Sequence, residues 1–262
     1  MVNLGCKFLF FCQDKIKFRK KKLFFLTNLK FGNHDQPRIG DKFGETHVNG
    51  LNTLILLLPG TPVTYYGEEI GLLGRSVSFD DTQDIFCKRF GPERYKLFSR
   101  DPQRGPMLWS GAKNAGFSNS NKTWLPVHKD FKTLNIEHQL KSDNATHPLQ
   151  IYKKLVKFRS EESAFIRGSF NHGYTTSNIY SFTRQFNKKG FLVVINVGKE
   201  DEEIENAFNC FNLTSQMKPQ VVFHTLNEPN YFSKMFHVNN DVKQNEILLT
   251  RGNAFVVSFV KV

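Results

Sequence analysis

The sequence contains few cysteines and no long apolar run, and each absence excludes a class of protein. Its four cysteines are too few and too scattered for a disulfide scaffold, and they lack the paired spacing of a zinc site. Cys6 and Cys12 are near enough to close a small loop, but spacing alone leaves open whether they pair. No run of about 18 uncharged apolar residues occurs, so we expect no membrane-spanning segment. Hydrophobic residues make up 39% of the chain, which is enough for a buried core.

Positive charge is concentrated at one end of the sequence. Lys and Arg number 36 against 24 Asp and Glu, a net charge of +12. Residues 1–30 hold eight basic residues against one acidic residue, whereas the rest of the chain holds 28 against 23. Nucleic-acid binding by a whole domain requires a broadly basic surface. We therefore expect no nucleic-acid partner.

Residues 1–25 differ in composition from the rest of the chain. Their basic, Phe-rich run KIKFRKKKLFF has no period of 2 or 3.6 residues. This pattern predicts an atypical, poorly packed leader; the alternative, a helix on a membrane surface, would need a continuous apolar face. The apolar stretch FLFF at 8–11 is short, and the positive charges follow it, so we recognise no secretory signal peptide.

Residues 26–163 alternate between strand-like and helix-like segments. A short strand is expected at 26–32 and another at 63–67, with a helix at 47–58 between them. A long loop rich in Gly, Pro, Asn and Asp follows, and an amphipathic helix at 149–160 ends the region. The residues expected on the inward faces of the two helices are Val48, Leu51, Leu54, Ile55, Leu58, Leu149, Tyr152, Leu155 and Val156.

Residues 164–262 lack helical periodicity and read as an antiparallel β-sandwich. A hairpin turn is expected at Lys188-Lys189-Gly190. The strand-like runs are 164–170, 178–186, 190–197, 219–226, 246–250 and 254–260.

The strongest candidate site is GNHDQPR at 32–38, where a strand is expected to give way to a loop. In a β/α barrel the carboxyl ends of the strands carry the active site, so His34 and Asp35 are candidates for catalysis there. Asn and Asp also favour helix N-caps and turns, so a purely structural role for the motif remains open.

Four separated motifs resemble the α-amylase superfamily of glycoside hydrolases (family 13) in its α-glucosidase, or maltase, branch. They occur in the expected order and extend from about residue 26 to the C-terminus. The motifs are GNHDQPR (32–38), HVNGLNTLILLLPGTPVTYYGEEIG (47–71), SRDPQRGPMLWSGAKNAGFS (99–118) and TWLPVHKDFKTLN (123–135). The resemblance implies a (β/α)8 TIM barrel followed by an antiparallel β domain.

The resemblance also assigns roles to three residues. Asp35 would stabilise the transition state without forming a covalent bond, and His34 would contact hydroxyls of the glucose at the cleavage site. Arg104 would hydrogen-bond the sugar at the non-reducing end. Such contacts suit an oxocarbenium-like transition state, which develops positive charge. The sequence departs from the family at RGPMLW, where relatives commonly read RTPMQW, which leaves the detail of the substrate contacts open.

The family's other two catalytic carboxylates are absent. No R-x-D motif, in which the family carries its nucleophile, occurs in the chain. A whole barrel takes roughly 250 residues, whereas residues 26–163 supply 138. We therefore expect about the last two strands and helices of a barrel, followed by the sandwich, and no hydrolysis by this chain alone. Glu68 and Glu69 cannot replace the pair, because neighbours on an extended chain point to opposite faces.

The remaining polar and aromatic residues carry weaker expectations. We expect a solvated acidic loop at Asp80, Asp81 and Asp84, with no metal site and no cofactor. Trp109 and Trp124 are candidates for stacking on a sugar or for packing the long loop. Tyr65 and Tyr66 are expected inside the barrel rather than at a ligand.

The expected parent is a retaining α-glucosidase that acts on maltose-like α-glucosides. The alternatives are the non-catalytic ectodomain of an amino-acid-transporter heavy chain and a sugar-binding pseudoenzyme. The resemblance implies an extracellular, secreted protein, although no signal peptide is recognised. The candidate N-glycosylation sites are Asn121, Asn144 and Asn212.

Overall fold

The computed structural model describes residues 28–226 and 247–261, so the leader at 1–25, with Cys6 and Cys12, lies outside the described residues. The described chain forms two compact units. We call residues 28–29, 49–62, 152–226 and 247–261 the sheet unit, and residues 30–48 and 63–151 the loop unit. The expected boundary between residues 163 and 164 stays a prediction. Each unit is described by itself.

Two short strands of the sheet unit pair in parallel. Strand β1 (Asn28–Leu29) lies beside β2 (Thr61–Pro62), as consecutive strands of a β/α barrel do. Residues 63–67, which we expected to be the second strand, form no strand, so that expectation is wrong. The chain turns there instead, because Gly67 takes a left-handed conformation with φ of 88°.

Helix α3 (Val48–Leu57) confirms the helix expected at 47–58. It is buried on more than the expected face, since Thr53 and Leu57 are as buried as Leu54. A side chain on Gly50 would lie 2.5 Å from the carbonyl oxygen of Gly252, so the close approach of these backbones requires glycine.

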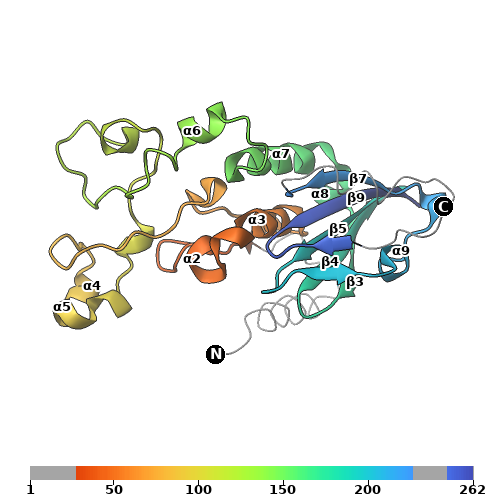
Figure 1. The fold of residues 1–262 in the computed structure, drawn as a ribbon, viewed down its shortest axis with the longest axis horizontal. Helices are drawn as coiled ribbons and strands as arrows, with labels where there is room; N and C mark the ends of the chain where they lie inside the picture. The colour runs from red at the N-terminus through yellow and green to blue at the C-terminus, as the bar shows by residue number, and fades with distance from the viewer. Residues whose placement is uncertain (1–27, 227–246, 262) are drawn as a thin grey trace. The chain divides into compact units, whose positions relative to one another are not determined.

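The main sheet has five antiparallel strands in the order β3-β4-β5-β9-β7 (Figure 1). Their bounds are β3 Ser169–Thr175, β4 Ile179–Phe186, β5 Lys189–Asn196, β7 Gln220–His224 and β9 Ala254–Val260. The β4–β5 hairpin turns at Asn187 and Lys188, one residue before the expected position. Asn187 has a φ of 55°, a left-handed conformation that Asn tolerates better than most residues.

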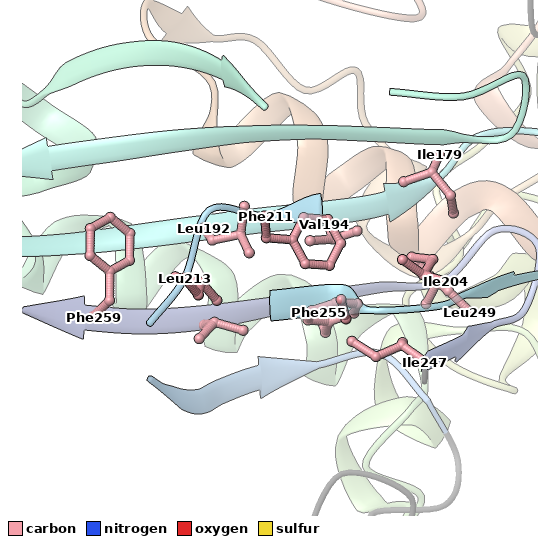
Figure 2. Packing of buried hydrophobic residues seen from close by; sticks show 12 residues of the cluster. Ile179, Leu192, Val194, Ile204, Phe211, Leu213, Ile247, Leu249, Phe255 and Phe259 are labelled. Carbon is pink, nitrogen blue, oxygen red and sulfur yellow. The ribbon is translucent and has the colours of Figure 1, made fainter. Parts of the chain in front are cut away.

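A second, two-stranded sheet, β6 (Glu202–Ile204) with β8 (Ile247–Leu249), shares a core with the main sheet. Figure 2 shows this core, in which Leu192, Phe255 and Leu249 come from strands of both sheets. The nearby helices are α9 (Ala207–Cys210) and η7 (Ser215–Met217).

The other face of the main sheet packs on helices. The ring centroids of Phe158, Phe165 and Phe191 lie 5.0–5.3 Å apart, joining α7 (Pro148–Glu161) and α8 (Ser163–Arg167) to β5. Both faces of β5 are therefore buried, which explains its continuous apolar run.

Two local expectations for the sheet unit need correction. Residues 164–167 belong to helix α8 rather than to a strand, and β3 begins only after Gly168. A Cβ at Gly168 would lie 2.3 Å from the carbonyl oxygen of Ala164, so this tight helix end requires glycine. On α7, Leu155 is buried as expected, but Val156 is 43% exposed. That helix turns a slightly different face inward than the pattern predicts.

The loop unit consists of short helices and irregular segments around its own core. Ile70, Leu72, Leu108 and Ala115 are buried together at its centre. The helices are α2 (Ile39–Phe43), η2 (Glu45–His47), η3 (Glu68–Ile70), α4 (Ile85–Lys88), α5 (Gly91–Arg94), η4 (Tyr95–Leu97), η5 (Asp101–Gln103), η6 (Lys113–Gly116) and α6 (Ile136–Lys141).

Candidate functional site

The GNHDQPR segment is held by its first and last residues. Gly32 packs so closely on Glu68 that an added Cβ would lie 2.3 Å from a carboxylate oxygen. At the other end Arg38 is buried, and it donates hydrogen bonds to the carbonyl oxygens of Tyr66 and, at 2.9 Å, of Gln103. Its guanidinium also lies 4.7 Å from the centre of the Tyr66 ring. The loop between these anchors therefore has a defined position.

Asp35 is the centre of an exposed cluster of charged side chains in this loop. Its Oδ1 accepts hydrogen bonds from Arg104 Nη2 at 2.8 Å and from Arg100 Nη1 at 3.3 Å. The His34 Nε2 atom lies 3.2 Å from Asp35 Oδ2. The Asp35 side chain is 46% exposed, so solvent and ligands can reach it. The three residues predicted for the site are thus together.

Neither alternative role predicted for the motif accounts for the Asp35 carboxylate. The adjoining helix α2 has Arg38 at its N-cap and no side-chain capping bond. Asn33 does act as a turn residue, since its Oδ1 accepts from the backbone N–H of Asp35 at 2.8 Å. The carboxylate of Asp35 is engaged with cations instead.

Arg100 is fixed from behind by a buried carboxylate. Its Nε and Nη2 donate to Asp84 at 2.9 and 2.8 Å, a two-point contact that matches a planar guanidinium to a carboxylate. These bonds hold the pKa of Asp84 at about 2, below its ordinary value of 3.8. The bonds to Asp84 therefore fix the position from which the Arg100 guanidinium contacts Asp35.

The expected solvated acidic loop is wrong for Asp84. This residue is buried, and its backbone N–H donates to the Asp101 carboxylate at 3.0 Å. The same Asp101 oxygen accepts from Thr82 Oγ1 at 2.5 Å and from the Gln83 backbone at 2.7 Å. The loop is folded around Asp101, because one carboxylate satisfies three donors at once.

Glu68 and Glu69 lie on the short helix η3. Glu68 is buried, and its Oε2 accepts from the Tyr65 backbone N–H at 2.9 Å. Burial raises the pKa of both carboxyls. Glu68 is structural, whereas Glu69 lines a cavity.

The cavity has a volume of about 460 Å³ and lies in the loop unit. Trp109 and Trp124 both line it, and the two roles expected for them, stacking on a sugar and packing the long loop, stay predictions. Tyr66 lines it too, and the expectation that this ring lies inside the barrel rather than at a ligand stays a prediction. The lining residues are Tyr66, Glu69, Arg104, Gly105, Pro106, Met107, Trp109, Phe117, Trp124 and Leu125.

The other predicted sites are placed as follows. The side chains of Asn121, Asn144 and Asn212 are exposed, so all three sequons are accessible. Cys87 and Cys210 are free thiols. Within 28–226 and 247–261, no group of three or more His, Cys, Asp or Glu side chains is arranged to hold a metal ion. In the same ranges no helix has the length and apolar character to cross a membrane.

Sequence reasoning missed Arg38, Arg100 and Asp84. All three lie in or beside the quoted motifs, but no pattern of spacing indicates that Asp84 and Arg100 pair.

The comparisons with known proteins place this chain in a family whose members have a barrel as their catalytic domain. Residues 13–168, more than half of the chain, match the family model of the α-amylase catalytic domain, and the chain belongs to the α-amylase family. Within that family it lies in the α-glucosidase (maltase) branch.

Sequence relatives support this placement. The chain is 39% identical over 200 residues to maltase 1 of Drosophila virilis, covering 75% of this chain and 31% of the relative. It is 39% identical over 175 residues to the salivary alpha-glucosidase of Aedes aegypti, covering 66% and 30%. It is also 34% identical over 176 residues to the human amino acid transporter heavy chain SLC3A1, covering 66% and 23%. The chain thus spans about a third of the length of its maltase relatives.

Solved structures share the fold. The trehalulose synthase MutB of Pseudomonas mesoacidophila MX-45 aligns with a TM-score of 0.76 at 22% identity, covering all of this chain and 47% of MutB. The trehalose-6-phosphate hydrolase TreA of Bacillus licheniformis aligns with a TM-score of 0.72 at 24% identity, covering 90% and 43%. These relationships imply a TIM-barrel fold, and the chain contains an antiparallel sheet as well.

Proposed function

We propose that this chain carries the glucose-binding part of a retaining α-glucosidase site, without the residues that break the glycosidic bond. In this proposal Asp35 stabilises the transition state, and His34 and Arg104 bind hydroxyls of the glucose at the cleavage site. The chain supplies the last strands and helices of a barrel and the antiparallel domain that follows. Its natural ligand is a maltose-like α-glucoside of the extracellular space.

The proposal rests on hydrogen bonds between residues that are far apart in the sequence. Arg104 donates to Asp35 Oδ1 at 2.8 Å and to the carbonyl oxygen of His34 at 2.9 Å, across 69 and 70 positions. A half-exposed carboxylate beside donors is suited to the hydroxyls and developing positive charge of a distorted sugar.

Two carboxylates of the loop unit, Asp84 and Glu68, are engaged in other contacts and do not serve as the nucleophile or the acid/base group. Retaining hydrolysis requires two carboxyl groups about 5–5.5 Å apart, one as nucleophile and one as acid and base. Asp84 is occupied by Arg100, and Glu68 is buried against Gly32. The chain on its own should therefore bind sugar without hydrolysing it.

The test combines activity and binding measurements on residues 1–262. A chromogenic α-glucoside should show no turnover, whereas calorimetry with glucose should show binding. The Asp35→Asn variant should bind about tenfold more weakly, because it loses a charged hydrogen-bond acceptor, about 1.4 kcal/mol. Asp130→Asn, a change at another carboxylate that is half exposed, should bind like the wild type.

Three results would contradict this proposal. Turnover that disappears in Asp35→Asn would mean that the chain has complete catalytic machinery. Glucose binding that is equal in wild type, Asp35→Asn and Asp130→Asn would remove Asp35 from the site, and absence of binding would favour the heavy-chain alternative, for which the relative SLC3A1 speaks.

A further inference from the structure

Residues 85–98 of the loop unit carry large apolar side chains that face solvent, and we call this segment the basic apolar patch. Leu97 is 77% exposed and Ile85 is 73% exposed, the two highest values among the large hydrophobic side chains of the described residues. Phe86, next to Ile85, is 49% exposed. Single exposed hydrophobic residues are ordinary, whereas several gathered in one segment mark an interaction site.

The segment that presents these side chains is firmly packed. It consists of helices α4, α5 and η4, which contact one another (Figure 1). Cys87 and Tyr95 are buried, and the Tyr95 hydroxyl donates to the carbonyl oxygen of Val77 at 2.9 Å. The ring of Phe90 stacks on that of Phe98, with 3.8 Å between the ring centroids. The exposed apolar side chains therefore project from a backbone that is held in place.

Positive charge surrounds the exposed apolar side chains. Residues 85–98 contain four basic residues and one acidic residue. A Lys or Arg near an anionic membrane surface strengthens binding about fivefold. All four basic side chains are exposed, and none forms an ion pair with another described residue: Lys88, Arg89, Arg94 and Lys96.

Two other occupants fit the basic apolar patch less well. A second copy of the chain, in a symmetric contact, would set four cations against four cations, which repulsion between like charges opposes. A protein partner would need a shaped pocket for each protruding side chain, and Lys is depleted in protein–protein interfaces. A lipid surface is deformable and takes protruding apolar side chains without a pocket, while its headgroup phosphates pair with the cations.

We propose that the basic apolar patch docks on a lipid membrane that carries anionic headgroups. Ile85, Phe86 and Leu97 enter the boundary between headgroups and acyl chains, and the surrounding Lys and Arg side chains contact the phosphates. The proposal is independent of the proposed function, because none of these side chains is assigned to the sugar site. Arg100 lies 5.7 Å from the centre of the Phe86 ring and also contacts Asp35, so docking would bring the charged cluster close to the membrane.

Cosedimentation of residues 1–262 with lipid vesicles tests this proposal. Vesicles of phosphatidylcholine and phosphatidylserine should bind the chain, and more tightly than phosphatidylcholine alone. The basic residues at 1–30 also attract anionic vesicles, so the comparison is made between variants that share them. Leu97→Glu should weaken binding to the anionic vesicles at least about tenfold, because it removes a buried apolar contact and adds a negative charge. Leu140→Glu changes another exposed leucine of the loop unit, outside the patch, and should bind like the wild type.

Quenching by brominated acyl chains reports insertion at a defined position. Leu97→Trp places a tryptophan in the patch, and its emission should be quenched on anionic vesicles with bromine in the acyl chains. Leu140→Trp is the matched control and should be quenched no more than the two native tryptophans of the wild type. Attraction through residues 1–30 alone would leave position 97 in water, so this measurement separates the patch from the basic N-terminal segment.

Three results would overturn the membrane proposal. The first is equal binding of anionic vesicles by the wild type and Leu97→Glu. The second is quenching of Leu97→Trp that does not exceed that of Leu140→Trp. The third is binding to poly-glutamate that Leu97→Glu weakens while vesicle binding is unchanged, which would assign the patch to an acidic protein. Both substituted leucines are exposed, so the variants should fold, which circular dichroism checks.

Discussion

Asp84 shows how one buried carboxylate organises an exposed site. It accepts two hydrogen bonds from the Arg100 guanidinium and one from the Phe86 N–H, where it caps helix α4. Arg100 then contacts Asp35 with its remaining terminal nitrogen. Removing the Asp84 carboxylate would leave the Arg100 guanidinium, which is 37% exposed, without its two-point carboxylate partner.

The depressed pKa of Asp84 makes this contribution dependent on pH. Because the pKa is about 2 in the folded chain and 3.8 without its partners, the stabilisation is fully present above 3.8 and is lost as the pH falls towards 2. Asp84→Asn should lower the free energy of unfolding at neutral pH by about 1–2 kcal/mol, because Asp84 is buried but its partner Arg100 is partly screened by solvent. Urea unfolding across this pH range should show that the free energy of unfolding falls less with acidification in the variant than in the wild type. An equal loss in both proteins would place the acid sensitivity elsewhere.

Two arginines satisfy the end of helix α3. The last carbonyl groups of a helix have no partner within it. Arg159, on α7, donates to Leu58 O at 3.1 Å and Gly60 O at 2.6 Å, and also to Leu56 O. Arg184, on β4, donates to Leu57 O at 3.1 Å. Cations also suit the negative end of the helix dipole, which explains why the buried Arg184 and the half-buried Arg159 have no carboxylate partner among the described residues.

Arg184 is the more deeply buried of the two arginines. Burial, with the nearby charge of Arg159 as a smaller cause, lowers its pKa to about 10. It also donates to the carbonyl oxygens of Phe165 and Gly168, so one side chain joins α3, α8 and β4. The helix is thereby tied to the antiparallel sheet, although its sequence neighbours belong to the loop unit.

Arg184→Met tests this link. The variant leaves several buried carbonyl groups without a donor, so the free energy of unfolding should fall by about 3 kcal/mol. Hydrogen exchange should accelerate most in α3 and α8. Arg167→Met, at an exposed arginine of α8, should change either quantity little. Uniform acceleration over the whole chain would argue against a local role for Arg184.

At the scale of the whole molecule, the described residues contain too few strands in parallel pairing to close a barrel. In residues 28–226 and 247–261, β1 pairs with β2 alone, and all other ladders are antiparallel. A two-stranded sheet is marginal without further packing. The chain spans about a third of its maltase relatives, and the antiparallel sheet and helix α3 form most of its buried core. We infer that stability resides mainly in the sheet unit.

The sequons give a prediction for the intact chain in a secretory pathway. Asn121, Asn144 and Asn212 are exposed, and a salivary relative suggests secretion. Expression behind a heterologous signal peptide should add up to three glycans. Each single Asn→Gln change should lower the mass of the secreted protein by one glycan. After enzymatic deglycosylation, the wild type and the variants should have the same mass apart from the substitutions. A sequon that stays unmodified would contradict the prediction for that site, because all three asparagines are exposed in the folded chain.

Periodicity along the sequence predicted the longer helices and several strands of the main sheet. The helices at 47–58 and 149–160 and the strands at 178–186, 190–197 and 254–260 were foreseen from periodicity. The strand expected at 63–67 was wrong because Tyr65 and Tyr66 look like strand residues until Gly67 turns the chain. Helix α8 was missed because a five-residue helix is too short for a period to be recognised.

The identity and order of the motifs, read from the sequence, indicated the family. They also selected His34, Asp35 and Arg104 as candidate site residues. Tertiary structure alone decided that Arg100 and Asp84 support Asp35, that arginines end α3, and that the tryptophans line a cavity. The reason is physical: periodicity reports which face of one element is apolar, whereas hydrogen bonds between residues about 16 to 127 positions apart depend on how the chain folds back on itself.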